Sequence, residues 1–508
     1  MRNVVLVLFC LGDLALTGCP REERGPRTPR PAVRAPVAAK KLATARRTPK
    51  LDYPDTVKRL EVVPGPAKPG GRLDARGELV VVDALGNVFW GRLPSRPKRI
   101  GNIEPHRGSI SRVGSAQAYW SPDGRRILLY ADIETSDYWF LWDRRRLRGL
   151  DAGIRAIQGR VSSAPAWLAG NRLALGALPA FHGQEHLLGA GSLGSVTVAS
   201  AHPWRKLMTM TGPSGAERTG VWVSPDHSYL VMAGWEEKGR TQARFEVRDA
   251  RGRRLGSFSQ SLHDRQPVVW RADNPDEFIV RAGPYRFARY DKRGRRLASW
   301  EFQNVGHLEG VPPETWPSPD AKRMVATKGE GLLLILGKNR SLPIVPEGVR
   351  AKNCLWSPQG DLVGFVGGAQ VTDKQAYIYR VGKHQVVAID PRWSFRILGY
   401  TNAAWSPDGK WLAARAARGE GRESLIVVDR GLTQALALTP EPSSAAERIW
   451  IEVHGWSADG RHIVYLARRR SGKRATQELY VIRVDGGGQR KLLDLSDVTY
   501  VSLRDPPA

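Results

Sequence analysis

Two short segments of this chain bring together side chains that could do chemistry. Ser192 lies in Ala190-Gly-Ser-Leu-Gly194, which approximates a nucleophile elbow, a sharp strand-to-helix turn that exposes a serine hydroxyl for acyl transfer. His182 and His186 stand four residues apart, and on a helix their rings could bind one metal ion. Both segments fall in a glycine-rich stretch without helical periodicity, so we expect loops there, with no catalytic residue, no metal ligand and no cofactor.

The element that organises the chain is a turn between two apolar runs, seen most clearly at Trp405-Ser-Pro-Asp-Gly409. Proline presets φ at the first corner of a turn, aspartate hydrogen-bonds to its own backbone, and glycine accepts the positive φ that closes the turn. Two apolar runs that flank such a turn predict a β-hairpin.

This unit recurs along the chain at intervals of 40 to 55 residues. The anchor positions are Leu73, Trp120, Trp167, Trp222, Trp270, Trp316, Trp356, Trp405 and Trp456, and the turn residues that go with them are Asp123, Gly124, Asp226, Asp320, Gly360, Asp408, Gly409, Asp459 and Gly460. A repeat of this length with several short strands is typical of propeller blades. A flat indole on the innermost strand would fill the wedge between blades, so we interpret these residues as structural.

The repeats predict an all-β protein, a single β-propeller of eight or nine four-stranded blades over residues 58–508. The first repeat shows only three strand-like runs, Glu78–Asp83, Asn87–Leu93 and Lys98–Ile103. A further strand-like run, Val498–Leu503, follows the last repeat. We predict that it supplies the missing inner strand of the first blade and closes the ring without an open edge.

The N-terminus has the plan of a secretory signal, with a short basic start and an apolar run that is too short to span a bilayer. Leu16-Thr-Gly-Cys19 resembles the lipobox of bacterial lipoproteins. The resemblance implies that residues 1–18 are removed and that Cys19 carries the lipid, a stable membrane anchor. Because Pro20 and not aspartate follows, it also implies outer-membrane sorting in a cell with two membranes.

Residues 19–57 are rich in proline and arginine and poor in apolar residues. Such a composition predicts a disordered tether. It could be a solvated stalk that lifts the propeller off the membrane, or its charge could hold it against anionic headgroups.

The repeated Trp-Ser-Pro-Asp-Gly turn, together with Glu478-Leu-Tyr-Val-Ile482 and the glycines that follow it, resembles the WD40-like (PD40) repeat of TolB-type propellers. The resemblance covers residues 60–505. TolB carries an α/β domain before its propeller and this chain shows none, so we expect a relative and not TolB itself. Similar propellers precede the hydrolase domain of prolyl-oligopeptidase-type enzymes, and we expect no such domain after Asp485.

The chain has 78 Lys+Arg against 50 Asp+Glu, a formal net charge of +28, which favours anionic partners or surfaces. Basic runs at Arg144–Arg148 and Arg468–Arg474 could grip phosphate or could be solvated turns. We interpret the protein as a monomeric, membrane-anchored scaffold in the cell envelope that binds another envelope protein. The alternative is a hydrolase or lyase acting on an anionic polymer at the central channel. Nucleic-acid binding ranks last, because the aromatic residues have structural roles.

Overall fold

The structure, a computed structural model, consists of strands and turns. It describes residues 57–65, 73–103, 113–133, 136–149, 166–175, 195–201, 204–211, 218–235, 242–261, 268–270, 274–283, 286–301, 315–320, 322–328, 331–337, 340–345, 349–368, 375–395, 403–418, 422–439, 447–472, 474–495 and 498–504. In these ranges no helix is long and apolar enough to cross a membrane.

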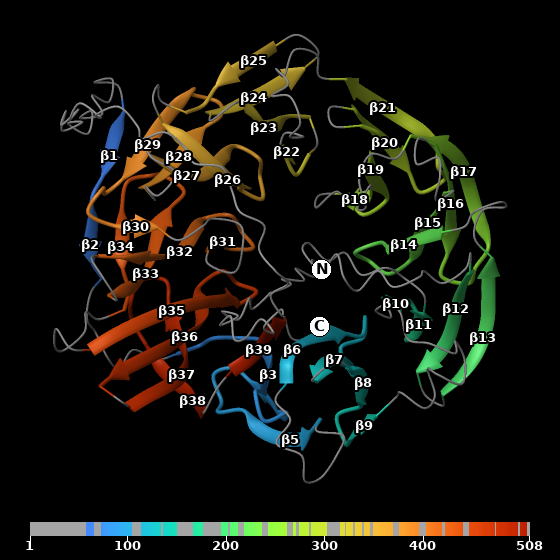
Figure 1. The fold of residues 1–508 in the computed structure, drawn as a ribbon, viewed down its shortest axis with the longest axis horizontal. Coiled ribbons are helices and arrows are strands. Elements are labelled where there is room, and N and C mark those ends of the chain that lie inside the picture. The colour runs from blue at the N-terminus through green and yellow to red at the C-terminus, as the bar shows by residue number, and fades with distance from the viewer. Residues whose placement is uncertain are drawn as a thin grey trace, which may run out of the picture.

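The described strands form nine small sheets, which follow one another around a ring (Figure 1). We number the sheets in chain order. Sheet 1 contains β39 (Val498–Arg504), β3 (Glu78–Asp83), β4 (Asn87–Arg92) and β5 (Lys98–Asn102); sheet 2 contains β6 (Val113–Trp120), β7 (Ile127–Ile133), β8 (Ser136–Trp142) and β9 (Leu147–Gly149); sheet 3 contains β10 (Ala166–Leu168), β11 (Arg172–Leu175), β12 (Ser195–Ala201) and β13 (Trp204–Thr211).

The next three sheets have the same plan. Sheet 4 contains β14 (Arg218–Val223), β15 (Tyr229–Trp235), β16 (Ala243–Asp249) and β17 (Arg254–Gln260); sheet 5 contains β18 (Val268–Trp270), β19 (Glu277–Arg281), β20 (Arg286–Asp291) and β21 (Arg296–Glu301); sheet 6 contains β22 (Thr315–Pro317), β23 (Met324–Lys328), β24 (Gly331–Gly337) and β25 (Arg340–Pro343).

The last three sheets carry the additions to this plan. Sheet 7 contains β26 (Arg350–Trp356), β27 (Leu362–Gly368), β28 (Gln375–Arg380), β29 (Gln385–Ile389) and, as a fifth strand, β1 (Lys58–Leu60); sheet 8 contains β30 (Ser394–Phe395), β31 (Ala403–Trp405), β32 (Trp411–Ala417), β33 (Glu423–Asp429), β34 (Ala435–Ala437) and β2 (Val62–Pro64); sheet 9 contains β35 (Glu447–Trp456), β36 (His462–Ser471), β37 (Arg474–Arg483) and β38 (Arg490–Leu495). A ring of such antiparallel sheets is the arrangement of a β-propeller.

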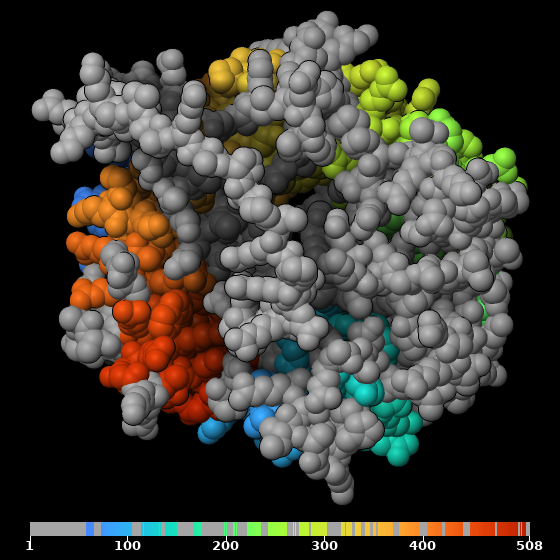
Figure 2. All heavy atoms as spheres, in the orientation of Figure 1, coloured from blue at the N-terminus to red at the C-terminus, as the bar shows by residue number. Residues whose placement is uncertain are grey.

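The second strand of a sheet is buried on both faces, because a neighbouring sheet covers each of them. All residues of β3 and β27 are buried, whereas the outer strand β17 alternates between exposed and half-buried residues. The hydrophobic clusters therefore lie between sheets: Val80 and Val82 of sheet 1 pack with Leu129 and Ala131 of sheet 2. In Figure 2 the described residues of sheets 7, 8 and 9, coloured orange to red, form one surface along a side of the ring.

The closing strand predicted from the sequence is confirmed. Strand β39 pairs antiparallel with β3, with Val501 opposite Val81, and takes the inner position of sheet 1. The indole nitrogen of Trp120, in sheet 2, donates a hydrogen bond to Ser502 Oγ at 3.2 Å. The two ends of the repeat array are thus joined in one sheet, and the three strands expected for the first repeat lie where the sequence placed them.

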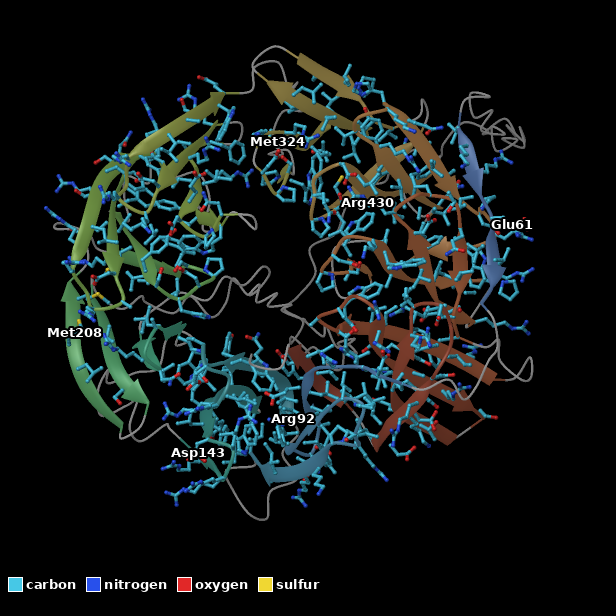
Figure 3. The ribbon with its side chains drawn as sticks, turned by 180° about the vertical axis from the view of Figure 1, so that it is seen from behind. Glu61, Arg92, Asp143, Met208, Met324 and Arg430 are labelled. Atoms are coloured by element: carbon cyan, nitrogen blue, oxygen red, sulfur yellow. The ribbon has the colours of Figure 1, made fainter. Side chains whose placement is uncertain are left out.

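A feature that the sequence did not reveal is an N-terminal strap, residues 58–65, on the outer rim of sheets 7 and 8. Strand β1 pairs in parallel with β29 and β2 with β34. The side chains of Leu60 and Val62 are buried in the cluster between these two sheets. Figure 3 shows Glu61 at this rim, where its carboxylate accepts a hydrogen bond from Arg392 at 2.7 Å. The strap therefore ties two neighbouring sheets together.

One expected loop is a strand. Arg468, Arg469 and Arg470, which the sequence placed in a basic loop, belong to the ten-residue strand β36. The strand continues because cross-strand carboxylates neutralise two of these arginines: Arg468 lies 3.2 Å from Glu452 and Arg469 lies 3.4 Å from Glu478.

If β39 closes the ring, a cavity in it should weaken the whole molecule. Val501 is 1% exposed, and Val501→Ala should lower the free energy of unfolding by about 2 kcal/mol, measured by urea denaturation of the full chain. Leu297→Ala, on the exposed outer face of sheet 5, is the control and should change it by less than about 1 kcal/mol. Equal losses in the two variants would show that β39 is not part of the cooperative core.

Candidate functional site at the turn face

The repeated turn is built around a buried serine, as sheet 8 shows. Ser406 is fully buried. Its hydroxyl donates to Asp408 Oδ1 at 2.7 Å and accepts the backbone N–H of Trp411 at 3.0 Å. The N–H of Gly409 closes the turn onto the carbonyl of Ser406 at 2.8 Å, and Gly409 has a φ of 66°. One hydroxyl thus bonds both the carboxylate within the turn and the first main-chain N–H of the strand that follows it.

Five other turns repeat this arrangement. Each has a serine that is at most 2% exposed and accepts the N–H of the residue five positions later; these serines are Ser121, Ser224, Ser318, Ser357 and Ser457. Gly124, Gly360 and Gly460 take a positive φ as Gly409 does, and in sheet 4 His227 takes this role with a φ of 61°. From the sequence we assigned roles to the proline, aspartate and glycine of the turn and none to the serine. The repetition of a serine before proline or alanine was the signal that could have revealed its structural role.

The aspartates of these turns cap the same hydroxyl. Asp123, Asp320, Asp408 and Asp459 accept hydrogen bonds from their serines at 2.5 to 2.7 Å. Burial by itself would raise the pKa of these carboxyls, but the serine hydroxyl and a backbone N–H together lower it below its usual value, and Asp226 shows the same direction. The turn carboxylates are therefore ionised partners of the backbone.

The repeated tryptophans lie at the contacts between sheets. Trp222, Trp356, Trp405 and Trp456 are buried, and Trp120 and Trp316 are half-buried. Two of these indoles donate to a carbonyl on the inner strand of the preceding sheet: Trp356 donates to Trp316 at 2.9 Å and Trp456 to Ala404 at 3.1 Å. These two hydrogen bonds join neighbouring sheets, whereas the Trp405 indole nitrogen is buried without a partner among the described residues.

Neighbouring turns also contact one another and form a continuous surface. Gln359 of sheet 7 donates to the carbonyl of Asp408 in sheet 8 at 2.7 Å, and Asn171 of sheet 3 donates to Asp123 of sheet 2 at 2.7 Å. In an antiparallel four-stranded sheet the turn between the third and fourth strands lies at the same end as the first turn. We call the surface that carries both sets of turns the turn face.

Basic side chains dominate the turns between the third and fourth strands. In the described turns these are Arg96 in sheet 1, Arg144, Arg145 and Arg146 in sheet 2, Arg251 and Arg253 in sheet 4, Lys292, Arg293 and Arg295 in sheet 5, Lys383 in sheet 7 and Arg430 in sheet 8. Of these, Arg144 and Arg430 are half-buried and the others are exposed. The acidic residues beside them turn inward.

Two of these turns are nearly identical and show how the carboxylate is used. Asp249 accepts the N–H groups of Arg251 and Arg253, both at 2.9 Å, and Asp291 accepts those of Arg293 and Arg295 at the same distance. In sheet 2, burial opposes ionisation of Asp143, but two backbone N–H groups and Arg148 lower its pKa to about 2. The acids cap the turns and also pair with Arg253 at 3.2 Å and Arg295 at 2.8 Å, whereas the side chains of Arg251 and Arg293 are exposed.

The junction between sheets 1 and 2 pairs an arginine of such a turn with a carboxylate of the preceding sheet. Glu78 is fully buried and accepts both Arg144, at 2.8 and 2.9 Å, and Arg92, at 3.2 Å. The Arg144 guanidinium lies 5.4 Å from the centroid of the Trp90 ring. The ion pairs and the indole fill this junction (Figure 3 labels Arg92 and Asp143 there).

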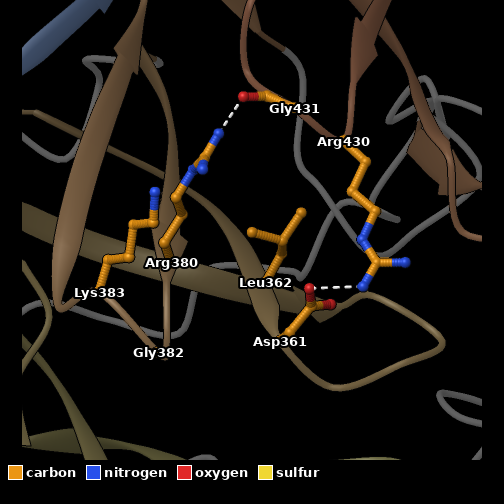
Figure 4. Close-up of a pocket in the computed structure, with 7 residues that line it drawn as sticks. All are labelled: Asp361, Leu362, Arg380, Gly382, Lys383, Arg430 and Gly431. Atoms are coloured by element: carbon orange, nitrogen blue, oxygen red, sulfur yellow. Dashed lines mark hydrogen bonds and ion pairs between the residues drawn. The ribbon is translucent and has the colours of Figure 1, made fainter.

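The corresponding junction between sheets 7 and 8 is hollow. A pocket of about 430 Å³ is lined by Asp361, Leu362, Arg380, Gly382, Lys383, Arg430 and Gly431. Arg430 donates to Asp361 at 2.7 Å, and Arg380 donates to the carbonyl of Gly431 (Figure 4). In that view Leu362 stands between the Arg380 and Arg430 side chains. The pocket therefore presents cationic groups from two sheets.

A second group of titratable residues lies on sheet 9. His454, on the inner strand β35, is buried, and burial lowers its pKa to about 4 although the nearby Glu452 opposes this. Its Nε2 lies 3.9 Å from Glu452, which is beyond hydrogen-bond distance. No group of three or more His, Cys, Asp or Glu side chains in the described ranges is arranged to hold a metal ion.

The remaining candidates from the sequence lie outside the described residues. These are Cys19, the histidines His182 and His186, and Ser192. Cys354 is buried in β26, in the core between sheets 6 and 7.

No family model matches the chain. Among curated proteins, the probable dipeptidyl-aminopeptidase B of Neosartorya fischeri is 25% identical over 177 residues, which is 29% of this chain and 19% of that protein. The protein of the same name from Aspergillus fumigatus matches equally over the same shares. The match thus spans about one fifth of the length of these relatives.

Solved structures are similar to most of the chain at low identity. A putative TolB from Agrobacterium tumefaciens has 11% identity and a TM-score of 0.27 over 86% of this chain and all of that one. A eukaryotic initiation factor has 12% identity and a TM-score of 0.38 over the same shares. A dihydro-heme d1 dehydrogenase has 12% identity and a TM-score of 0.39 over 86% of this chain and 77% of its own. None of these similarities assigns an activity.

Removal of one turn hydroxyl tests its structural role. Ser406→Ala leaves the Trp411 N–H and the Asp408 carboxylate without this partner, and should lower the free energy of unfolding by about 1 to 3 kcal/mol in urea denaturation. Ser259→Ala, at an exposed position of β17, should be neutral within about 0.5 kcal/mol. A neutral Ser406→Ala would mean that water replaces the hydroxyl.

The lowered pKa of the turn carboxyls predicts the response to acid. A carboxyl whose pKa is lower in the folded than in the unfolded state stabilises the fold above the unfolded value, and this is lost as the pH falls through the folded value. The urea midpoint should therefore be flat near neutral pH and fall below about pH 4. The triple variant D123N/D408N/D459N should show a shallower fall, and an unchanged slope would contradict the assignment.

Proposed function

We propose that this protein is a lipid-anchored, extracytoplasmic β-propeller of nine blades that binds a partner protein of the cell envelope through its turn face. The observation that carries the proposal is the set of exposed basic side chains on the turns between third and fourth strands, in sheets 1, 2, 4, 5 and 7. A rigid scaffold holds these cations in place, and their charge is complementary to that of a partner with an acidic surface.

The electrostatics of the turn face support binding to an acidic protein. The turn aspartates are occupied by serine hydroxyls and backbone N–H groups, so they offer few acceptors to a partner. Exposed arginines in opposition to an acidic surface accelerate association and select the partner by charge. Arginine also forms paired hydrogen bonds with carboxylates.

The membrane anchor in this proposal is Cys19, whose sequence context resembles a lipobox, with residues 19–57 as a tether. The strap supports this arrangement, because it fastens residues 58–65 to the rim of two sheets by main-chain pairing and by the buried side chains of Leu60 and Val62. Mechanical force on the tether would then be transmitted to sheets 7 and 8 and not to a single loop.

A second candidate is an enzyme that acts on an anionic polymer at the inner strands. The observation in its favour is the group formed by Glu452, His454 and Arg468 on β35 and β36, with Arg468 3.2 Å from Glu452. A buried, neutral imidazole beside a carboxylate and a guanidinium could take part in proton transfer.

The test uses the full chain in its native membranes, cross-linked and purified with its partners. The variant R145E/R146E reverses two exposed charges on the turn face, whereas R448E/R470E reverses two exposed charges on β35 and β36. We expect the first variant to lose about tenfold or more of a discrete cross-linked protein, and the second to keep it. A discrete product that both variants retain would contradict the turn face as the binding surface, and the capture of nothing but salt-sensitive polyanions would overturn the adaptor role and favour the enzyme.

Metabolic labelling tests the anchor. The wild type should incorporate labelled fatty acid and sediment with membranes, and Cys19→Ser should do neither. A labelled Cys19→Ser protein would show that the acylated residue lies elsewhere.

A further inference from the structure

The pocket between sheets 7 and 8 is lined by more cationic than anionic side chains. Three cationic side chains, Arg380, Lys383 and Arg430, line it together with one carboxylate, Asp361. The Lys383 side chain is exposed and makes no hydrogen bond or ion pair with the described residues. Arg380 Nε is buried and has no hydrogen-bond partner among the described residues. The exposed Lys383 ammonium is therefore the donor that an anion can reach directly, and Arg380 keeps one donor unsatisfied.

The junction between sheets 1 and 2 shows what a closed site of this type looks like. Arg92 stands at the end of the third strand opposite Glu78, and Arg380 stands at the same place opposite Leu362. In sheet 1 the buried Glu78 neutralises Arg92 and Arg144. In sheet 7 an apolar residue replaces that glutamate, and the Arg380 guanidinium donates to the main-chain carbonyl of Gly431 instead of to a carboxylate.

The one carboxylate in the pocket is already committed. Asp361 accepts Arg430 at 2.7 Å and Ser357 at 2.9 Å. Burial would raise its pKa, but these two hydrogen bonds lower it, so it stays ionised and fixes the Arg430 guanidinium. A guanidinium fixed in this way at the wall of a pocket is oriented before a ligand arrives, which reduces the entropic cost of binding.

We propose that this pocket binds a phosphoryl group. Guanidinium groups match the geometry of phosphate oxygens by paired hydrogen bonds, and a lysine adds a compact point charge. The volume of about 430 Å³ falls in the range of small-molecule sites, about 300 to 1,000 Å³, so the phosphoryl group would be one part of a larger molecule. Leu362, in the pocket wall, offers an apolar contact to the remainder.

The surroundings of the pocket are also cationic. Lys58 of the strap donates to the carbonyl of Leu432, in the same turn as Arg430, at 3.3 Å. Lys410, in the turn of sheet 8, offers its carbonyl to the N–H of Arg430 at 2.8 Å, and its ammonium pairs with Asp408 at 3.1 Å. Lys58 of the strap thus adds positive charge near the pocket, which attracts an anion from solution.

The proposal does not depend on the protein partner, and two sources of the phosphoryl group are distinguishable. The first measurement is calorimetric titration of inorganic pyrophosphate into the full chain that carries Cys19→Ser, so that no acyl chain is present. The second is sedimentation of the same protein with phosphatidylcholine vesicles that do or do not contain phosphatidic acid.

The test variant is Lys383→Gln, and the matched control is Lys322→Gln, an exposed lysine in the turn of sheet 6. We expect Lys383→Gln to weaken binding in at least one of the two measurements by about fivefold or more, and Lys322→Gln to leave it unchanged. Binding of pyrophosphate alone would indicate a soluble phosphorylated ligand, and a preference for phosphatidic acid would indicate a lipid headgroup.

Two outcomes would overturn the proposal. One is the absence of saturable binding in both measurements. The other is an equal loss in both variants, which would show that the general positive charge attracts the anion. Thermal unfolding of each variant confirms that it is folded, and R145E/R146E should bind pyrophosphate like the wild type, which separates this site from the protein-binding face.

Discussion

The structure depends on the burial of strands between neighbouring sheets. A residue such as Val81 is fully buried because its own sheet and the adjacent ones exclude water from it. A four-stranded sheet by itself would leave two apolar faces in water, and its contribution to stability grows only with the next sheet. The array of sheets must therefore close into a ring, and β39, from the C-terminal end of the repeats, completes sheet 1. The strap adds a second long-range connection at sheets 7 and 8.

Within this ring, the turns divide the charged residues into two roles. Carboxylates close the turns, since an ionised side chain that accepts two or three N–H groups satisfies donors which the strands cannot use. The cations that remain are left at the surface of a rigid frame. The positive charge of the chain is thus a property of specific turns and not of a tail alone, and it is the basis of the proposed binding of an acidic partner at the turn face.

The two arginine junctions show how one substitution changes the role of a site. Glu78 and Leu362 occupy the same position in sheets 1 and 7, because each begins the second strand and lies opposite the arginine that ends the third strand. With glutamate, two arginines pair with one buried carboxylate; with leucine, Arg380 has no such counter-ion and a hollow remains. A buried carboxylate is stable only when it is fully paired, so the first junction is closed to ligands and the second is available to an anion.

The sequence by itself determined the repeat, the strands of most sheets, the turn chemistry and the strand that closes the ring. These follow from local rules, because a Trp-Ser-Pro-Asp-Gly turn between apolar runs specifies its hairpin, and a spare strand needs a partner. It did not reveal the strap, since its two three-residue strands are too short for a periodic pattern and pair with the outer edges of two sheets more than 300 residues away. It placed Arg468–Arg470 in a loop, because their counter-ions lie on other strands. The sequence also did not indicate the pocket, since Arg380 and Arg430 come from different sheets. Only the packing of these two sheets determined that Arg430 pairs with a carboxylate and that Arg380 does not.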